Sequence, residues 1–190
     1  MQNPLDPHQE KIFLEESRQD MANFREVYTS YLPKVFAYVS YRIGRVQDTE
    51  DVVSNIFLKV VERLGEFQWR GEGSFAAWLF KIAHDQVVDH YRQNTTNHKT
   101  VGVEELPEMF QLVLLPTDHT LQKEKFDYLR QLIGRLSPRR QEIVTLKFYG
   151  GLRNTEIAQV LGLDERTVAS HLCRALNALH SMYLDESPLL

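Results

Sequence analysis

The stretch from Asn154 to Leu176, NTEIAQVLGLDERTVASHLCRAL, constrains the fold more than any other part of this sequence. Gly162 interrupts it, and glycine readily adopts the left-handed conformation that ends a helix. Asp164 follows, and its carboxylate can cap the backbone donors of a second helix. Apolar residues recur at the spacing of one helical face on both sides of the glycine: Ile157, Val160 and Leu161 before it, and Val168, Leu172, Ala175, Leu176 and Leu179 after it. The pattern predicts two helices joined by a tight turn.

Such a pair of helices is a helix-turn-helix, whose second helix can lie in the major groove of DNA. The exposed face of the second helix would carry Arg166, Ala169, Ser170, His171 and Arg174. A helical hairpin of an interaction domain has the same apolar pattern. The local sequence therefore favours DNA binding and leaves a protein partner as the alternative.

The charge is divided unevenly along the 190 residues. The net charge of -4 argues against a protein that coats nucleic acid by bulk attraction. Basic residues nevertheless outnumber acidic ones between Arg139 and His180, whereas acidic residues gather in 6–26 and 48–66. A local basic patch in the C-terminal part thus remains compatible with DNA binding.

The composition indicates a soluble globular protein with 43% hydrophobic residues. No apolar run approaches the roughly 20 residues that span a bilayer, and the start of the chain lacks an apolar signal core, so we expect a cytoplasmic protein. Cys173 is the single cysteine and cannot form an internal disulfide. We interpret it as a small packing residue, with a redox sensor or metal ligand as the lesser alternative.

The N-terminal part predicts a leader over 1–20, helical from Glu10 onward, and then a long helix from Met21 to Gly44 that Pro33 kinks or restarts. The next helix is predicted to be capped by Asp48 or Thr49. Its apolar positions form a broad buried stripe: Val52, Val53, Ile56, Phe57, Val60, Val61 and Leu64. The charged residues on its other faces are ordinarily explained by solvation alone.

Residues 65–73, GEFQWRGEG, break the helical periodicity and set Phe67, Trp69 and Arg70 in a glycine-rich loop. Large aromatic side chains in such a loop either pack back on the protein or meet a ligand. Ser74 is predicted to cap a fourth helix that runs to about residue 92. Its outward positions include Lys81, His84, Asp85, Gln86, Asp89 and Arg92.

From residue 94 to 120 the sequence has the turn formers of a linker, although an apolar patch over 109–115 suggests packing on a domain or a partner. A helix is predicted from Leu121, and Ser137 with Pro138 marks the start of another, as N-cap and first helical residue. The fold expected is all-α, with two small helical domains at 21–93 and 121–182 and a polar tail at 183–190.

The sequence offers no arrangement of residues that would support catalysis. It contains no phosphate-binding loop, nucleophile elbow or paired catalytic carboxylates, and no internal repeat. His84, His90 and His98 lack the spacing of a metal site. We therefore expect no enzyme activity, no cofactor and no bound metal.

Two motifs together resemble a known family. DTEDVVSNIFLKVVERL with SFAAWLFKIAHDQVVDHYR is similar to region 2 of an extracytoplasmic-function (group 4) sigma factor, and LSPRRQEIVTLKFYGGLRNTEIAQVLGLDERTVASHLCRAL is similar to its region 4. The resemblance covers roughly residues 22–92 and 125–180, and both motifs occur in the family's order. It implies a bacterial transcription initiation factor that binds core RNA polymerase and promoter DNA, held inactive by an anti-sigma factor.

The resemblance also implies roles for individual positions. Five residues match those that dock on the coiled coil of the largest polymerase subunit: Asp48, Glu50, Asp51, Asn55 and Lys59. The 65–73 loop matches the one that receives an extruded base of the minus-ten element, with the neighbouring duplex along the fourth helix; the candidates are Phe67, Trp69, Arg70, Lys81, His84, Gln86 and Arg92. The helix-turn-helix would read the minus-thirty-five element through Arg153, Arg166, Thr167, Ser170, His171 and Arg174.

Some positions depart from the family pattern. Family members often have a basic residue where Ala169 and His171 stand, and an Arg-Asn pair where His84 and Asp85 stand. Unaided promoter binding is therefore expected to be weak and to depend on polymerase. Two alternatives stay open: a DNA-binding regulator that acts without polymerase, and a sigma mimic that sequesters an anti-sigma factor.

Overall fold

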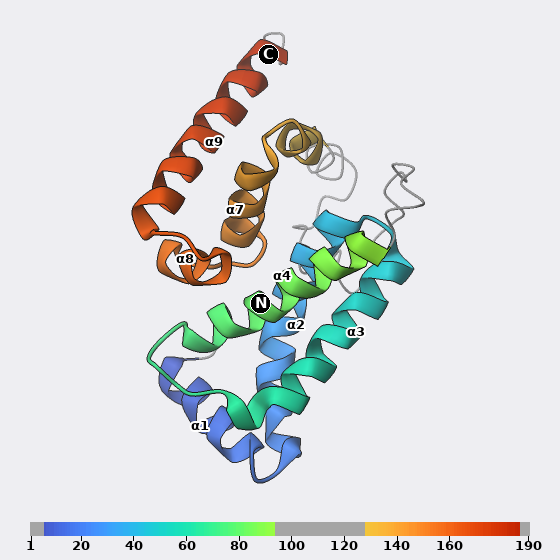
Figure 1. The fold of residues 1–190 in the computed structure, drawn as a ribbon, viewed down its shortest axis with the longest axis vertical. Coiled ribbons are helices and arrows are strands. Elements are labelled where there is room, and N and C mark those ends of the chain that lie inside the picture. Colours follow the sequence, from blue (N-terminus) through green and yellow to red (C-terminus); the bar gives the residue numbers. More distant parts are fainter. Residues whose placement is uncertain (1–5, 94–127, 187–190) are drawn as a thin grey trace, which may run out of the picture.

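The structure, a computed structural model, describes residues 6–93 and 128–186, and within these ranges the regular elements are all helices (Figure 1). The N-terminal half contains α1 (Pro7–Ser17), α2 (Phe24–Ile43), α3 (Val46–Arg63) and α4 (Ser74–Gln93). The C-terminal half contains a helical segment at 128–134 followed by α7 (Pro138–Phe148), α8 (Asn154–Leu161) and α9 (Glu165–Glu186). The predicted all-α fold is confirmed. The apolar patch at 109–115 lies outside the described residues.

Residues 7–17, within the predicted leader, form a helix. Helix α1 starts at Pro7, three residues before the predicted start, because the Asp6 carboxylate accepts a hydrogen bond from the His8 backbone N–H at 2.8 Å and proline occupies the first turn. Leu14 is buried against the rest of the N-terminal half. The segment is therefore an integral helix of this half.

Two predicted boundaries differ from the structure. Helix α2 runs through Pro33 without a break, since Tyr31 and Val35 on either side of the proline are buried in the same core. Helix α3 begins at Val46, so Asp48 lies in its first turn and Thr49 is inside the helix. The buried Thr49 hydroxyl donates to the Arg45 carbonyl at 2.8 Å, a bond within the helix that replaces the predicted capping role.

The helix-turn-helix forms as predicted. Helix α8 ends at Gly162, whose φ of 64° is left-handed, and α9 starts after Asp164. Ser137 is the N-cap of α7 and Pro138 its first residue, also as predicted. A small core between α7, α9 and the 128–134 segment contains Leu132, Ile133, Leu136, Val144, Ala175 and Leu179.

The two halves share one hydrophobic core. Ile143, Leu146 and Ile157 of the C-terminal half are fully buried in the same cluster as the core residues of α2 and α4. Helix α8 packs on α4, and Figure 1 shows α8 beside the N-terminal part of α4. Gly150 lies at this junction, where a Cβ would approach the Phe80 ring at 3.0 Å. The structure thus places the helix-turn-helix directly against the fourth helix.

Candidate nucleic-acid interface

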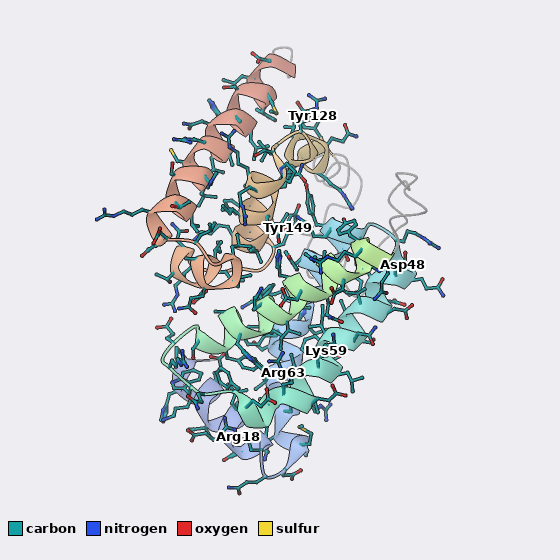
Figure 2. The ribbon with its side chains drawn as sticks, in the orientation of Figure 1. Arg18, Asp48, Lys59, Arg63, Tyr128 and Tyr149 are labelled. Carbon is teal, nitrogen blue, oxygen red and sulfur yellow. The ribbon has the colours of Figure 1, made fainter. Side chains whose placement is uncertain are left out.

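The outer face of α3 is polar and exposed. Glu50, Asp51, Asn55 and Lys59 are exposed, while Asp48 is partly covered and pairs with Arg45 at 3.4 Å. Figure 2 shows Asp48 and Lys59 along the length of this helix. The spacing along α3 therefore brings four of the five residues predicted to bind polymerase, Asp48, Asp51, Asn55 and Lys59, onto one side of the helix, and leaves Glu50 on its opposite flank.

Leu58 belongs to this surface but was missed by the sequence reasoning. It stands at 56% exposure, and the spacing of Asp51, Asn55, Leu58 and Glu62 places all four on one stripe of α3. A large apolar side chain in the middle of a polar stripe is typical of an interface anchor. The signal was present in the sequence as a leucine outside the buried stripe.

The three candidates in the 65–73 loop occupy different environments. Phe67 is buried at 6% exposure, where its ring packs edge-on against Phe75 at 5.4 Å and tilted against Trp78 at 5.2 Å. Phe67 is therefore largely a core residue, although part of it also lines the cavity described below, and its contact with a base stays a prediction. Trp69 is partly buried and Arg70 is exposed, so these two remain available to a ligand.

Short-range hydrogen bonds shape the loop where it enters α4. The Ser74 hydroxyl donates to the Gly71 carbonyl at 2.6 Å and accepts from the Arg70 backbone N–H at 3.2 Å. Gly73 has a φ of 79°, and a Cβ there would overlap the carboxylate of Glu156 from α8. Glycine at position 73 thus permits both the loop conformation and its contact with the C-terminal half.

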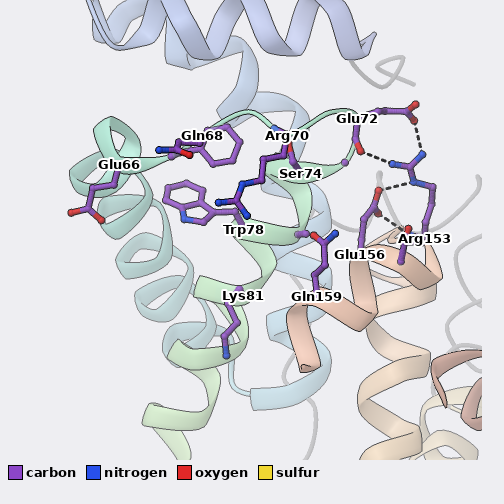
Figure 3. A pocket seen from close by; sticks show the side chains of 14 residues that line it. Glu66, Gln68, Arg70, Glu72, Ser74, Trp78, Lys81, Arg153, Glu156 and Gln159 are labelled. Carbon is purple, nitrogen blue, oxygen red and sulfur yellow. Dashed lines mark hydrogen bonds and ion pairs between the residues drawn. The ribbon is translucent and has the colours of Figure 1, made fainter. Parts of the chain in front are cut away.

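A cavity of about 670 Å³ lies between the loop, α4 and α8 (Figure 3). The N-terminal half contributes Gln68, Arg70, Trp78 and Lys81 to its lining, and α8 contributes Gln159. Its walls combine an indole ring, cationic groups and amides with the carboxylates of Glu66, Glu72 and Glu156, and its volume falls in the range of ligand sites. We call it the first cavity.

Arg153 joins the two sides of the first cavity. Its guanidinium donates to the Glu72 carboxylate at 3.0 Å, to the Glu72 carbonyl at 2.8 Å and to the Glu156 carboxylate at 2.7 Å (Figure 3). The hydrogen bond and charge of Glu156 raise the pKa of Arg153 above its ordinary value. Arg153, predicted as a minus-thirty-five contact, therefore lies away from the other candidates of that group and binds the 65–73 loop.

The minus-ten candidates on α4 also differ in their surroundings. Lys81 and Arg92 are exposed and pair with Asp85 at 2.8 Å and Asp89 at 3.7 Å, and Gln86 is half-buried. His84 was predicted to face outward, but its Nδ1 lies 3.1 Å from a carboxylate oxygen of Glu142 on α7. The prediction for His84 was wrong because α7 covers this side of α4. The sequence of α4 alone does not reveal that contact.

Glu142 is the centre of a buried polar cluster between the halves. The Tyr38 hydroxyl donates to its carboxylate at 2.5 Å, Arg42 forms an ion pair with it, and His84 lies on the same oxygen as Tyr38. Burial alone would raise the pKa of the Glu142 carboxyl, but the hydrogen bond with His84 and the charge of Arg42 outweigh it and hold the pKa below its usual value. The carboxylate is thus stabilised in its charged form.

The outer face of α9 remains open. Arg166, Ser170 and Arg174 are exposed, Thr167 is partly exposed, and His171 is half-buried with its Nδ1 turned inward. Cys173 is exposed on the same helix, which contradicts its interpretation as a packing residue. The structure brings five of the six minus-thirty-five candidates together on α9, and leaves Arg153 apart.

Within the described ranges, no group of histidine, cysteine and acidic side chains has the arrangement of a metal site. Across the same ranges, no helix combines the length and apolar character needed to cross a bilayer.

Comparison with known families identifies two matching segments. Residues 27–96 match the family model of sigma-70 region 2, and residues 126–179 match that of sigma-70 region 4. The chain is 32% identical over 164 residues to the ECF RNA polymerase sigma factor BldN of Streptomyces coelicolor, covering 86% of this chain and 61% of BldN. It is 24% identical over 173 residues to the ECF RNA polymerase sigma factor SigW of Bacillus subtilis, covering 87% of this chain and 91% of SigW.

The fold is similar to two solved structures. CnrH, in complex with the cytosolic domain of CnrY, superposes with a TM-score of 0.71 at 19% identity, over 94% of this chain and 99% of that one. RpoE from Bartonella quintana, in complex with the anti-sigma factor NepR, gives a TM-score of 0.63 at 20% identity, over 87% and 99% of the two chains. At these identities the likeness establishes the arrangement of the helices.

Proposed function

The chain belongs to the extracytoplasmic-function sigma factors of the sigma-70 family, and from this premise we propose that it binds core RNA polymerase and directs it to specific promoters. The observation that carries the proposal is the presence, on one chain, of a polar α3 surface, a cavity of about 670 Å³ beside a glycine-rich loop, and an exposed recognition helix. A sigma factor uses all three together. No one of them is specific to it alone.

The α3 surface is the proposed polymerase contact. Its exposed carboxylates and amide surround Leu58, so a partner helix can bury one apolar anchor within a polar rim. The acidic character of Glu50 and Asp51 favours a basic partner surface.

The first cavity is the proposed site of an extruded minus-ten base. Unpairing and unstacking a base costs a few kcal/mol, which contacts with an aromatic ring and with the base edge offset. Trp78 supplies a ring in the lining, and Gln68 and Arg70 supply amide and guanidinium groups. Lys81 extends the positive charge along α4 towards the adjoining duplex.

The outer face of α9 is the proposed reader of the minus-thirty-five element. Arg166 and Arg174 are exposed and can contact phosphates or guanine edges, while Ser170 lies between them on the same face. The few cations on this face support weak unaided binding, strengthened when polymerase holds the promoter.

Transcription initiation requires the two halves to separate. The promoter elements are roughly 25 base pairs apart, about 85 Å at 3.4 Å per pair. In the structure α8 packs directly on α4 and lines the first cavity, so both elements cannot be read at once. The conformation described here is therefore a closed, resting form.

An anti-sigma factor is the proposed regulator that stabilises this resting form. The relatives CnrH and RpoE were solved in complexes, and RpoE's partner is named as an anti-sigma factor. A protein that covers the α3 surface would also compete with polymerase for that surface. We place the protein in the cytoplasm, where it acts without catalytic chemistry of its own.

In-vitro transcription with purified core polymerase tests the proposal. Promoter-specific transcripts that require both the chain and core polymerase support it. Failure to bind core, or core binding without a specific transcript, rejects it. A tight gel shift by the chain alone on a palindromic site would instead favour a regulator that acts without polymerase. Retained anti-sigma binding with no DNA crosslink would identify a mimic.

A further inference from the structure

The 65–73 loop runs beside α1 on its way from α3 to α4 (Figure 1). A second cavity, with a volume of about 330 Å³, lies between the two segments, with Leu14 and Arg18 on the α1 side and Gln68 and Trp69 on the loop side. Because this space separates them, α1 and the loop are not tightly packed against each other there. A polar contact that crosses from α1 to the loop therefore has a large share in fixing the loop.

Arg18 supplies such a contact. Its guanidinium donates a hydrogen bond to the backbone carbonyl of Phe67. Within residues 6–93 and 128–186, no other hydrogen bond joins α1 to the loop, and Arg18 forms no ion pair. The Phe67 carbonyl is therefore the partner that holds this side chain in place.

Helix α1 is itself fixed on the N-terminal half. Leu14 is buried at 3% exposure, and the Tyr31 hydroxyl of α2 donates to the buried Glu10 carboxylate. Arg18 is the C-cap residue of α1, and its backbone N–H donates to the Glu15 carbonyl at 3.3 Å. The guanidinium thus extends to the loop from a rigid base.

The bond from Arg18 acts on the peptide group between Phe67 and Gln68. The Phe67 ring is already held by aromatic side chains of α4. Since a peptide group is planar, fixing the Phe67 carbonyl also fixes the direction in which the chain continues to Gln68 and Trp69. Helices α1 and α4 together therefore set the course of the loop at its start.

The far end of the loop is fixed separately. There the Ser74 hydroxyl bonds with the Gly71 carbonyl and the Arg70 backbone N–H. Residues 68–70, which include Gln68 and Arg70 of the first cavity, lie between the two fixed ends. A loop held in this way has less conformational freedom to lose when it binds a base.

We propose that Arg18 is a positioning residue of the promoter reader: by holding the Phe67 carbonyl, it keeps the 65–73 loop in the shape that receives a minus-ten base, without contacting DNA itself. The proposal rests on the proposed function and deepens it. It extends the promoter reader to α1, which precedes the segment matched by the region 2 model.

Amide hydrogen exchange in the free, full-length chain tests the positioning step. The backbone N–H groups of Phe67 and Arg70 are both hydrogen-bonded in the structure. Arg18→Ala should speed their exchange about tenfold, with no change in α3 and α4, whereas Arg18→Lys keeps a donor and should stay near the wild type. Arg25→Ala is the matched control, because Arg25 is exposed on α2 and lines neither cavity.

Promoter opening by the holoenzyme tests the consequence for function. Arg18→Ala should slow opening about tenfold with core affinity unchanged, and Arg18→Lys should retain most of the rate. A fluorescent base in the minus-ten element follows the reaction. The salt dependence of promoter binding should stay as in the wild type, whereas loss of a direct phosphate contact would lower its slope by about one unit.

Three results would overturn the proposal. If loop exchange in Arg18→Ala matches the wild type while opening slows, Arg18 contacts DNA directly. If exchange rises equally throughout the N-terminal half, α1 supports the fold as a whole. If the loop exchanges faster and opening is unchanged, its shape does not limit base capture. Failure of the proposed function is a separate result, in which the wild-type chain gives no promoter-specific transcript.

Discussion

Tyr38 and Glu142, 104 positions apart in the chain, form a buried hydrogen bond of 2.5 Å between the two halves. Arg42 and His84 contact the same carboxylate, so three side chains from α2 and α4 hold one group from α7. Removing one member of such a buried cluster leaves the others without their partner, at a cost of about 3–5 kcal/mol. The carboxylate of Glu142 therefore stabilises the contact between the two halves.

Glu142→Ala should open the molecule without unfolding either half. Distances between a label on the single native cysteine, Cys173, and a second label at Arg25→Cys should lengthen and broaden in the free chain. Glu16→Ala, at an exposed glutamate of α1, is the control and should leave the distances as in the wild type. An unchanged narrow distribution in Glu142→Ala, with helix content retained, would refute the role of this carboxylate.

Low pH should weaken the contacts of the Glu142 carboxylate with Tyr38, Arg42 and His84. Because the closed form lowers the pKa of Glu142 below its ordinary value of 4.5, Glu142 contributes its full stabilisation above that value and loses it as the pH falls through the lowered pKa. In urea unfolding, wild type should exceed Glu142→Gln in stability at pH 7, and the difference should shrink below pH 4.5. A difference that stays constant across this window would contradict the assignment.

Leu58→Ala should weaken binding to core polymerase by about 1–2 kcal/mol, or roughly 5- to 30-fold, with little change in the melting temperature. The reason is that Leu58 is exposed and supports no part of the fold. Binding is measured by titration of a labelled chain with core enzyme. Met21→Ala, at another exposed apolar residue, should bind as the wild type does. Equal losses in the two variants would mean that α3 is not the contact.

Trp69→Ala should slow promoter opening about tenfold or more while leaving core affinity unchanged, because a lost stacking contact costs roughly 1–3 kcal/mol. A fluorescent base in the minus-ten element follows opening directly. Trp69→Phe keeps an aromatic ring and should retain most of the rate. Equal losses of opening and core binding, or loss of folding, would assign Trp69 to packing.

Local patterns in the sequence predicted the parts of the fold that depend on neighbours along the chain. The apolar stripe of α3 and the turn at Gly162 formed as expected, since a helical face and a left-handed glycine are encoded within a few residues. The helix starts at Pro7 and Val46 were placed wrongly, because backbone hydrogen bonds extend a helix beyond the residue that the pattern favours as its cap.

The parts that depend on distant residues were not predictable. In the sequence, Glu142 occupied an ordinary helical position and His84 looked like a surface group. In the structure their side chains are in contact, although the two residues are 58 positions apart in the chain. Likewise Phe67 and Trp69 are equivalent as loop aromatics, and only the packing of α4 makes one core and the other a cavity wall. The resemblance assigned Arg153 to DNA, but Glu72 and Glu156 bind its guanidinium.

In the proposed function, DNA would reach two surfaces at different stages. The outer face of α9 is exposed, whereas α8 lines the first cavity. Under the proposed function, duplex DNA would reach the exposed Arg166 and Arg174 with α8 in place, whereas the first cavity is lined by α8 and by Arg153, which is bound to Glu72. Under that proposal we expect upstream recognition to be a fast, reversible step and downstream capture a slower one, so that a wrong promoter bound only by α9 would dissociate before capture.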